Sequence, residues 1–146
     1  MARVLTICIH NSARSQMTAA YIREFCDGCA RVESAGLEPG TLNPHAVRAM
    51  SEDGIDISRN RTQSVSELYE RGEQFDYVIA VCNPEAAERC PVFPAEKIRL
   101  HWPFADPSAL TGDEDTIMVG VRAIRDAIKS RVRQFCKEEL YGCSGV

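Results

Sequence analysis

Short apolar runs that are typical of strands alternate with helical segments along this chain of 146 residues. The clearest run covers residues 75–81, which are almost continuously apolar and β-branched, as a strand buried on both faces requires. Helix signals lie between such runs, for example Asn43 followed by Pro44, an N-cap with proline in the first turn. Strands separated by helices are joined by right-handed crossovers into a parallel sheet. The alternation therefore predicts an α/β fold with helices on both faces of the sheet.

The same patterns give an approximate position for each element. Strands are expected at residues 4–7, 30–35, 75–81 and 97–101. Helices are expected at residues 16–25, from 44 to a stop at Gly54, and at 64–71. A last, long helix is indicated by apolar residues spaced three or four apart, which form one continuous face. These residues are Ile117, Val121, Ile124, Ile128, Val132 and Phe135.

Composition and charge exclude several classes of protein. Hydrophobic residues make up 45% and charged residues 26% of the chain, as in an ordinary globular domain. The formal net charge is −4 and no basic stripe is present, which argues against a nucleic-acid partner. No apolar run is long enough for a membrane span, and no export signal opens the chain. We therefore expect one cytoplasmic domain over residues 1–146, with no membrane partner and a flexible tail from about residue 140.

The segment from Cys8 to Ser15 carries the strongest chemical signal. Cys8 ends the first expected strand and Arg14 opens the first helix, with five residues between them. The N–H groups of such a loop and the positive helix end can hold a tetrahedral anion, to which Arg14 adds bidentate donors. The same field favours the thiolate form of Cys8, which Ser15 can also hydrogen-bond, so Cys8 is predicted to be a nucleophile. The predicted oxyanion-binding residues are His10, Asn11, Ser12, Ala13, Arg14 and Ser15.

Two further reactive residues follow expected strands. Ligands of parallel sheets bind beyond the carboxyl ends of the strands. Cys82 follows the third strand and Asp106 lies shortly after the fourth, so both are expected near Cys8. A carboxylic acid at this place could protonate a leaving oxygen. The alternative for Asp106, which precedes Pro107, is an ordinary turn.

The chain has seven cysteines, an odd number that argues against complete structural pairing. Cys82 and Cys90 flank a segment that begins with Asn83 and Pro84. If this segment is helical the two sulfurs lie too far apart to bond, whereas unwinding allows a disulfide. The pair is thus a candidate redox switch, and the alternative is two small buried residues. No Cys/His spacing typical of zinc lies nearby, and Cys26-x2-Cys29 is interpreted as structural.

Together these motifs resemble a known family. Cys8-x5-Arg14-Ser15 with a distant Asp106-Pro107 resembles the low-molecular-weight protein tyrosine phosphatase superfamily. Residues 11–17, 34–36, 82–91 and 101–107 resemble, more narrowly, the thioredoxin-coupled arsenate reductases, and the resemblance covers roughly residues 3–135. It implies a three-layer fold of the phosphatase I-like type, in which helices flank a four-stranded parallel sheet of order 2-1-3-4.

The resemblance also implies an activity. Arsenate would be reduced to arsenite through a disulfide relay of Cys8, Cys82 and Cys90, with Arg14 and Asp106 as further catalytic residues. Thioredoxin would supply the electrons, so we expect no metal and no cofactor, in a monomeric enzyme of arsenic detoxification.

Three alternatives stay open. A phosphotyrosine phosphatase needs Cys8, Arg14 and Asp106 but neither Cys82 nor Cys90. The absence of tyrosines soon after Asp106-Pro107, where such phosphatases carry aromatic residues, favours arsenate. A non-catalytic thiol sensor or metal-binding module is another class. Glutathione-, mycothiol- or bacillithiol-linked reduction would keep the reaction and change the donor.

Overall fold

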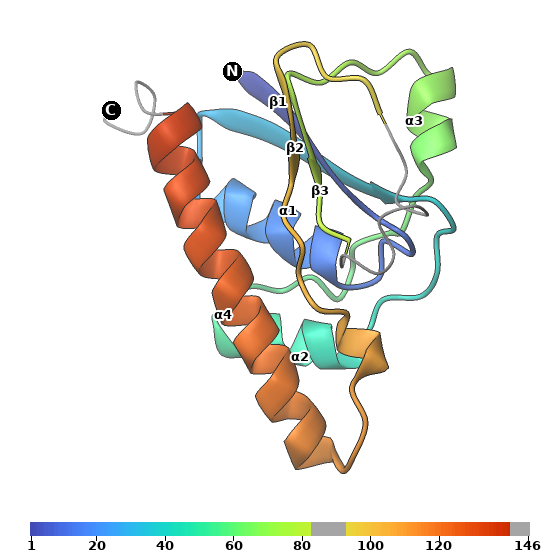
Figure 1. Cartoon of the computed structure of the whole chain (residues 1–146), viewed down its shortest axis with the longest axis vertical. Helices are drawn as coiled ribbons and strands as arrows, with labels where there is room; N and C mark the ends of the chain where they lie inside the picture. Colours follow the sequence, from blue (N-terminus) through green and yellow to red (C-terminus); the bar gives the residue numbers. More distant parts are fainter. Residues whose placement is uncertain (83–92, 141–146) are drawn as a thin grey trace.

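A four-stranded parallel sheet forms the centre of the computed structural model, which describes residues 1–82 and 93–140. The strands are β1 (Ala2–Cys8), β2 (Ala30–Gly36), β3 (Tyr77–Ala80) and β4 (Ile98–His101). They are hydrogen-bonded in the order β2-β1-β3-β4, and every neighbouring pair is parallel (Figure 1). The predicted parallel sheet and its order 2-1-3-4 are confirmed.

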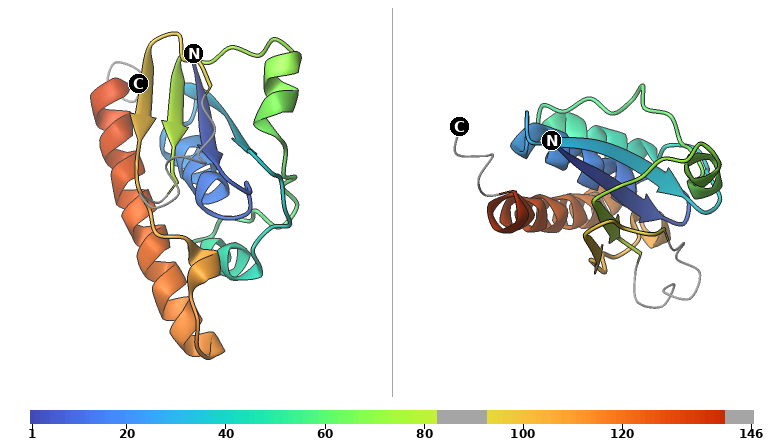
Figure 2. Two further views of the ribbon diagram at one scale, coloured as in Figure 1. Left: turned by 45° about the vertical axis from the view of Figure 1, so that its right-hand side comes forward. Right: turned by 90° about the horizontal axis from the view of Figure 1, so that it is seen from above.

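In the described residues, four α-helices connect and flank these strands. They are α1 (Arg14–Phe25), α2 (Pro44–Glu52), α3 (Val65–Glu70) and α4 (Glu114–Glu139). Asn43 caps α2 as predicted, because its side chain accepts hydrogen bonds from the N–H groups of His45 and Ala46. A 3-10 turn, η2 (Pro107–Ala109), follows Asp106. Figures 1 and 2 show α4 and α3 on opposite sides of the strands, so the sheet is the middle of three layers.

Alternate residues of the inner strands β1 and β3 pack in two separate cores. On one face, Val4 and Ile79 pack in the larger core with the apolar sides of α1 and α4. On the other face, Leu5 and Val78 pack with Leu68 of α3 and with two phenylalanines that lie outside the strands. This period of two explains why the central strands are apolar at nearly every position. The two phenylalanines are Phe75 and Phe93.

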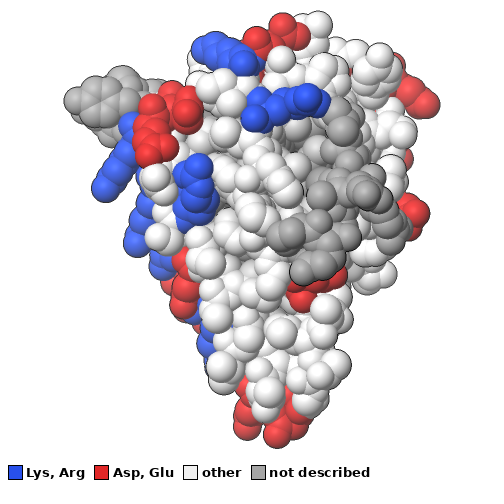
Figure 3. Space-filling view, viewed as in Figure 1, with Lys and Arg blue, Asp and Glu red and all other residues white. Residues whose placement is uncertain are grey.

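The long helix α4 dominates one edge of the molecule. In the view of Figure 3, side chains of both charge signs lie along the edge where Figure 1 places α4, and acidic groups gather at its lower tip. These include Glu114 and Asp115 in the first turn of α4, where negative charge complements the helix dipole. Within residues 1–82 and 93–140, no helix is both long and apolar enough to cross a bilayer.

A disulfide that the sequence did not predict joins α1 to α4. Cys26, directly after α1, is bonded to Cys136 near the end of α4, although 110 residues separate them. Both are buried. Cys29 is also disulfide-bonded. The bond between Cys26 and Cys136 forms because α1 and α4 pack side by side and bring the two sulfurs together.

Candidate active site

The loop between β1 and α1 curls around the sulfur of Cys8. Cys8 is 2% exposed, and among the described cysteines it is the free thiol. The backbone N–H of Asn11 points back at the sulfur, with N and Sγ 3.1 Å apart. This reversal needs a left-handed backbone, and Asn11 has a φ of 55°. Asn is one of the few residues other than Gly that tolerates such a φ.

Ser15 gives the sulfur a second hydrogen-bond partner. Its Oγ lies 2.9 Å from Cys8 Sγ and 2.8 Å from the amide Nδ2 of Asn11. Because the Asn11 amide can only donate, Ser15 Oγ accepts there and its own hydrogen is free to point at the sulfur. Both contacts aim hydrogen-bond donors at the sulfur atom, as a nucleophilic sulfur requires. The chemistry predicted for Cys8 therefore has matching geometry.

A buried amide of α1, which the sequence analysis missed, holds Asn11 in place. Gln16 is 1% exposed and its Nε2 donates to both the backbone oxygen and the Oδ1 of Asn11, each at 3.1 Å. The backbone N–H of Gln63 donates to the same Oδ1 at 3.1 Å. Gln16 also bonds to the segment after α2, through Asn60 and the carbonyl of Arg61. Asn60 and Arg61 thus help to hold Gln16, and through it the loop between β1 and α1.

Gly36 at the end of β2 lets the sheet approach the loop closely. A Cβ at this position would lie 2.8 Å from both the Asn11 nitrogen and the Ile9 oxygen, which are backbone atoms. No side chain fits there without moving the loop. The sequence signal for this contact is the glycine in the segment Ser34-Ala35-Gly36, but its reason is visible only in the fold.

Arg14 and Asp106 meet beside the loop. The Arg14 side chain is 5% exposed, and its Nη1 donates to the Phe104 carbonyl at 3.1 Å. Its Nη2 lies 3.7 Å from Oδ2 of Asp106, whose side chain is 33% exposed. Asp106 lies in the loop between β4 and η2. Its Oδ1 accepts a hydrogen bond from the backbone N–H of Ser108 at 2.9 Å. The arrangement provides a buried cation for an oxyanion and a carboxyl group next to it.

The other predicted loop residues occupy different surroundings. Ala13 is buried, and the carbonyl of Ser12 accepts the N–H of Asn43 at 2.9 Å. His10 is exposed, and its ring Nδ1 donates to the carbonyl of Glu38 at 3.1 Å. The His10 ring therefore lies on the outer surface of the loop. The anion-binding role predicted for residues 10–13 depends on their backbone N–H groups.

Cys82 lies just after β3, the strand next to β1, which ends at Cys8. Ile7 pairs with Ala80, and the N–H of Val81 donates to the carbonyl of Ile7 at 2.9 Å, so Cys8 lies across from Val81 and Cys82 follows one position later. Cys82 is fully buried in the same core as Cys8 and is disulfide-bonded. Its carbonyl accepts from Nε2 of His101 at 3.0 Å, at the end of β4. Cys90 lies outside the described residues.

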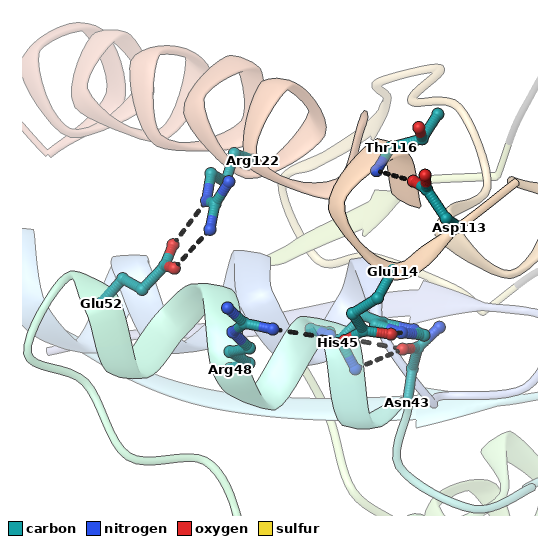
Figure 4. Close-up of polar contacts among 9 residues, drawn as sticks. Asn43, His45, Arg48, Glu52, Asp113, Glu114, Thr116 and Arg122 are labelled. Carbon is teal, nitrogen blue, oxygen red and sulfur yellow. Dashed lines mark hydrogen bonds and ion pairs between the residues drawn. The ribbon is translucent and has the colours of Figure 1, made fainter. Parts of the chain in front are cut away.

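Polar contacts join α2 to α4. Glu114 lies 2.9 Å from His45 Nε2 and 3.2 Å from Arg48 Nη1 (Figure 4). The hydrogen bond with His45 lowers the pKa of the Glu114 carboxyl. Further along, Arg122 binds both carboxylate oxygens of Glu52. We call His45, Arg48, Glu52, Glu114 and Arg122 the α2–α4 clasp. In the described part of the chain, no cluster of three or more His, Cys, Asp or Glu could hold a metal ion.

Comparison with known proteins points to one family. The family model described as low molecular weight phosphotyrosine protein phosphatase matches residues 3–141. The chain is 37% identical over 133 residues to an arsenate reductase of Bacillus subtilis, covering 90% of this chain and 92% of the relative.

Solved structures agree with this comparison. An arsenate reductase from Archaeoglobus fulgidus superposes with a TM-score of 0.73 at 29% identity, covering 92% of this chain and 99% of its own. A thioredoxin-dependent arsenate reductase of Corynebacterium glutamicum gives a TM-score of 0.71 at 26% identity, covering 97% of this chain and 63% of its own.

Proposed function

The chain belongs to the low molecular weight phosphotyrosine protein phosphatase family, and from this premise we propose that it is an arsenate reductase that draws electrons from thioredoxin. The observation that carries the proposal is the junction of β1 and α1. There a buried thiol has two hydrogen-bond donors, and the arginine that opens α1 is buried and lies 3.7 Å from a carboxyl group. The relatives that bear the name arsenate reductase are similar in sequence to this chain over 90% of its length.

The first step is attack on the oxyanion. The Cys8 thiolate forms a bond to arsenic(V), while the loop N–H groups and Arg14 hold the oxygens. One oxygen departs as water after Asp106 protonates it. The product is a thiol adduct on Cys8 in which arsenic is still pentavalent, so no electrons have yet moved to arsenic.

The second step reduces arsenic. Cys82, as a thiolate, attacks the Cys8 sulfur and the sulfur–arsenic bond breaks, with its electron pair going to arsenic. Arsenite leaves and a Cys8–Cys82 disulfide remains. Cys90 then attacks Cys82 and frees Cys8, and a thioredoxin dithiol reduces the resulting disulfide. The two electrons come from thiols alone, so the proposal includes no metal or other cofactor. It places the enzyme in the cytoplasm, as a monomer.

The position of Cys82 separates this reaction from ester hydrolysis. A hydrolase needs Cys8, Arg14 and Asp106, a set supported by the loop around Cys8 and by the approach of Arg14 to Asp106. It has no use for a second cysteine at the end of the neighbouring strand, where Cys82 lies. Hydrolysis of phosphate monoesters is therefore the second candidate function, supported by the same loop and by the family name.

The decisive experiment measures arsenate-dependent NADPH oxidation with thioredoxin and thioredoxin reductase. The parent protein should turn over many times. Cys82→Ser should stop multiple turnover and leave hydrolysis of an aryl phosphate unchanged, whereas Cys8→Ser should abolish both activities. The matched control replaces Cys26 and Cys136 by Ser, and it should retain reduction. Sustained arsenate turnover by Cys82→Ser would refute the relay.

A further inference from the structure

A chain of hydrogen bonds connects the oxyanion loop to the proposed general acid, and Asn43 stands at its centre. The backbone N–H of Asn43 donates to the carbonyl of Ser12, in the loop, at 2.9 Å. Its side-chain Nδ2 donates to Oγ of Ser108 at 3.2 Å. The backbone N–H of Ser108 in turn donates to Asp106 Oδ1 at 2.9 Å. Residues far apart in the sequence thus join the two halves of the site.

Asn43 is itself well fixed. Its Oδ1 accepts the N–H of His45 at 2.8 Å and that of Ala46 at 3.3 Å, as the cap of α2. The next residue but one, His45, is held by Glu114 of α4 as part of the α2–α4 clasp (Figure 4). A side chain that caps a helix and is anchored on both sides has little freedom left. It can therefore serve as a reference point for the more exposed Asp106.

The Ser108 bond also orients the Asp106 carboxyl group. Oδ1 accepts from the Ser108 N–H, which leaves Oδ2 as the oxygen that can present a proton to the site. Oδ2 is the oxygen that faces Arg14, which binds the oxyanion in the proposed mechanism. The proton is then directed at the leaving oxygen. A rotated carboxyl group would present its proton elsewhere.

We propose that Asn43 and Ser108 are positioning residues that hold Asp106 with its Oδ2 toward the oxyanion loop. This inference rests on the proposed function, because it assigns Asp106 the role of general acid. Asn43 and Ser108 line a cavity of about 420 Å³ that borders Ser12 and Pro107. The Asp106 side chain is itself 33% exposed, so packing alone does not fix it.

The test breaks the hydrogen bond between Asn43 and Ser108 and keeps both the N-cap of α2 and the Asp106 carboxyl group. Ser108→Ala deletes the Oγ partner of Asn43 and keeps the backbone bond to Asp106. Asn43→Ser keeps a good N-cap but is too short to reach Ser108. Each should lower kcat for arsenate reduction about three- to tenfold, the effect of one net hydrogen bond. The dissociation constant of inorganic phosphate should stay unchanged, because the loop and Arg14 are intact.

Three comparisons distinguish positioning from general damage. In an Asp106→Asn background the Ser108→Ala change should have no further effect on kcat, since no acid is left to position. The double variant of Asn43→Ser and Ser108→Ala should equal either single variant. The matched control is Asp113→Ser, which replaces the N-cap of α4 with another capping residue and should leave kcat unchanged.

The inference is wrong if both variants keep the parent kcat, if they weaken phosphate binding as much as they lower kcat, or if their effect persists in Asp106→Asn. Failure of the proposed function looks different, because the parent protein itself would not reduce arsenate. In that case hydrolysis of an aryl phosphate, which uses the same Cys8, Arg14 and Asp106, provides the kcat for the same comparisons.

Discussion

At the scale of single residues, the site depends on how closely backbone segments approach one another. Asn11 adopts its positive φ because hydrogen bonds from Gln16 and Gln63 hold its side-chain oxygen. Its backbone N–H then reaches the sulfur of Cys8. Gly36 passes behind this turn with room for a hydrogen only. The position of the Cys8 loop thus depends on Gly36, which lies 28 positions further along the sequence and has no reactive group.

Gly36→Ala should damage the site without touching a catalytic side chain. The new Cβ would meet two backbone atoms at 2.8 Å, so the loop must move. We expect the free energy of unfolding to fall by about 1–3 kcal/mol, as in other overpacked sites. Inorganic phosphate should bind at least tenfold more weakly, as measured by its protection of Cys8 against iodoacetamide.

A second glycine provides the control for this prediction. At Gly40 a Cβ would lie 3.7 Å from the His10 Cβ, which is an ordinary van der Waals contact. Gly40→Ala should therefore keep both phosphate affinity and stability close to those of the parent. Equal behaviour of the two variants would show that the close approach at Gly36 does not matter.

The sequence contained the reactive half of this site but not its support. Cys8, Arg14 and Ser15 lie within one strand–loop–helix unit, so their spacing alone predicts an anion site. Gln63 and Asn43 reach the loop from separate segments, and their contacts depend on how those segments pack. A polar residue in a loop gives no local sign of such a long-range bond. Asn43 was recognised from its sequence only as a helix cap.

At the scale of elements, α2 is fixed against α4 by charged groups along their shared face. Glu52 accepts hydrogen bonds from Arg122 at 2.8 and 2.9 Å and from Arg125 at 3.1 Å. The hydrogen bond from Arg122 is the main cause that lowers the pKa of Glu52 from 4.5 to about 2. Because the carboxylate is favoured in the folded protein, the contacts stabilise the fold above the ordinary pKa and are lost in acid.

Glu52→Gln should therefore lower Tm in a pH-dependent way. The difference between parent and variant should be fully present above about pH 4.5 and should shrink as the pH falls toward about 2, where Glu52 is protonated in the folded state as well. The pair is near the surface, so high salt should reduce the difference at neutral pH. Thermal unfolding followed by circular dichroism from pH 7 to pH 2 tests both points. A difference in Tm that is undiminished at pH 2 would contradict the assignment.

The elements themselves were largely predictable, and their ends were not. The third strand was expected at residues 75–81 but its ladder covers Tyr77–Ala80. Phe75 instead packs in the core beside α3, and the N–H of Asp76 donates to the carbonyl of Arg3. Apolar residues just outside a strand look the same in sequence as those within it. Strand order and pairing, by contrast, follow from crossover rules and the family resemblance, and both were predicted.

At the scale of the whole molecule, the Cys26–Cys136 disulfide closes the larger core. It links the end of α1, which begins at Arg14, to the end of α4, whose first turn supplies Glu114 to the α2–α4 clasp. The sequence separation of 110 makes this pairing invisible to any local pattern. A disulfide that closes so long a loop restricts the unfolded chain strongly, so its contribution to stability should be large.

Replacing Cys26 and Cys136 together by Ser should lower the free energy of unfolding by about 2–5 kcal/mol, the usual range for loss of a native disulfide. Denaturant unfolding without reductant measures this directly. Arsenate reduction by the double variant should remain at temperatures well below its Tm, because neither cysteine touches the Cys8 loop in the described contacts. If stability were unchanged, the packing of α1 on α4 would suffice without the bond. If reduction were lost in the folded variant, the two cysteines would have to belong to the relay.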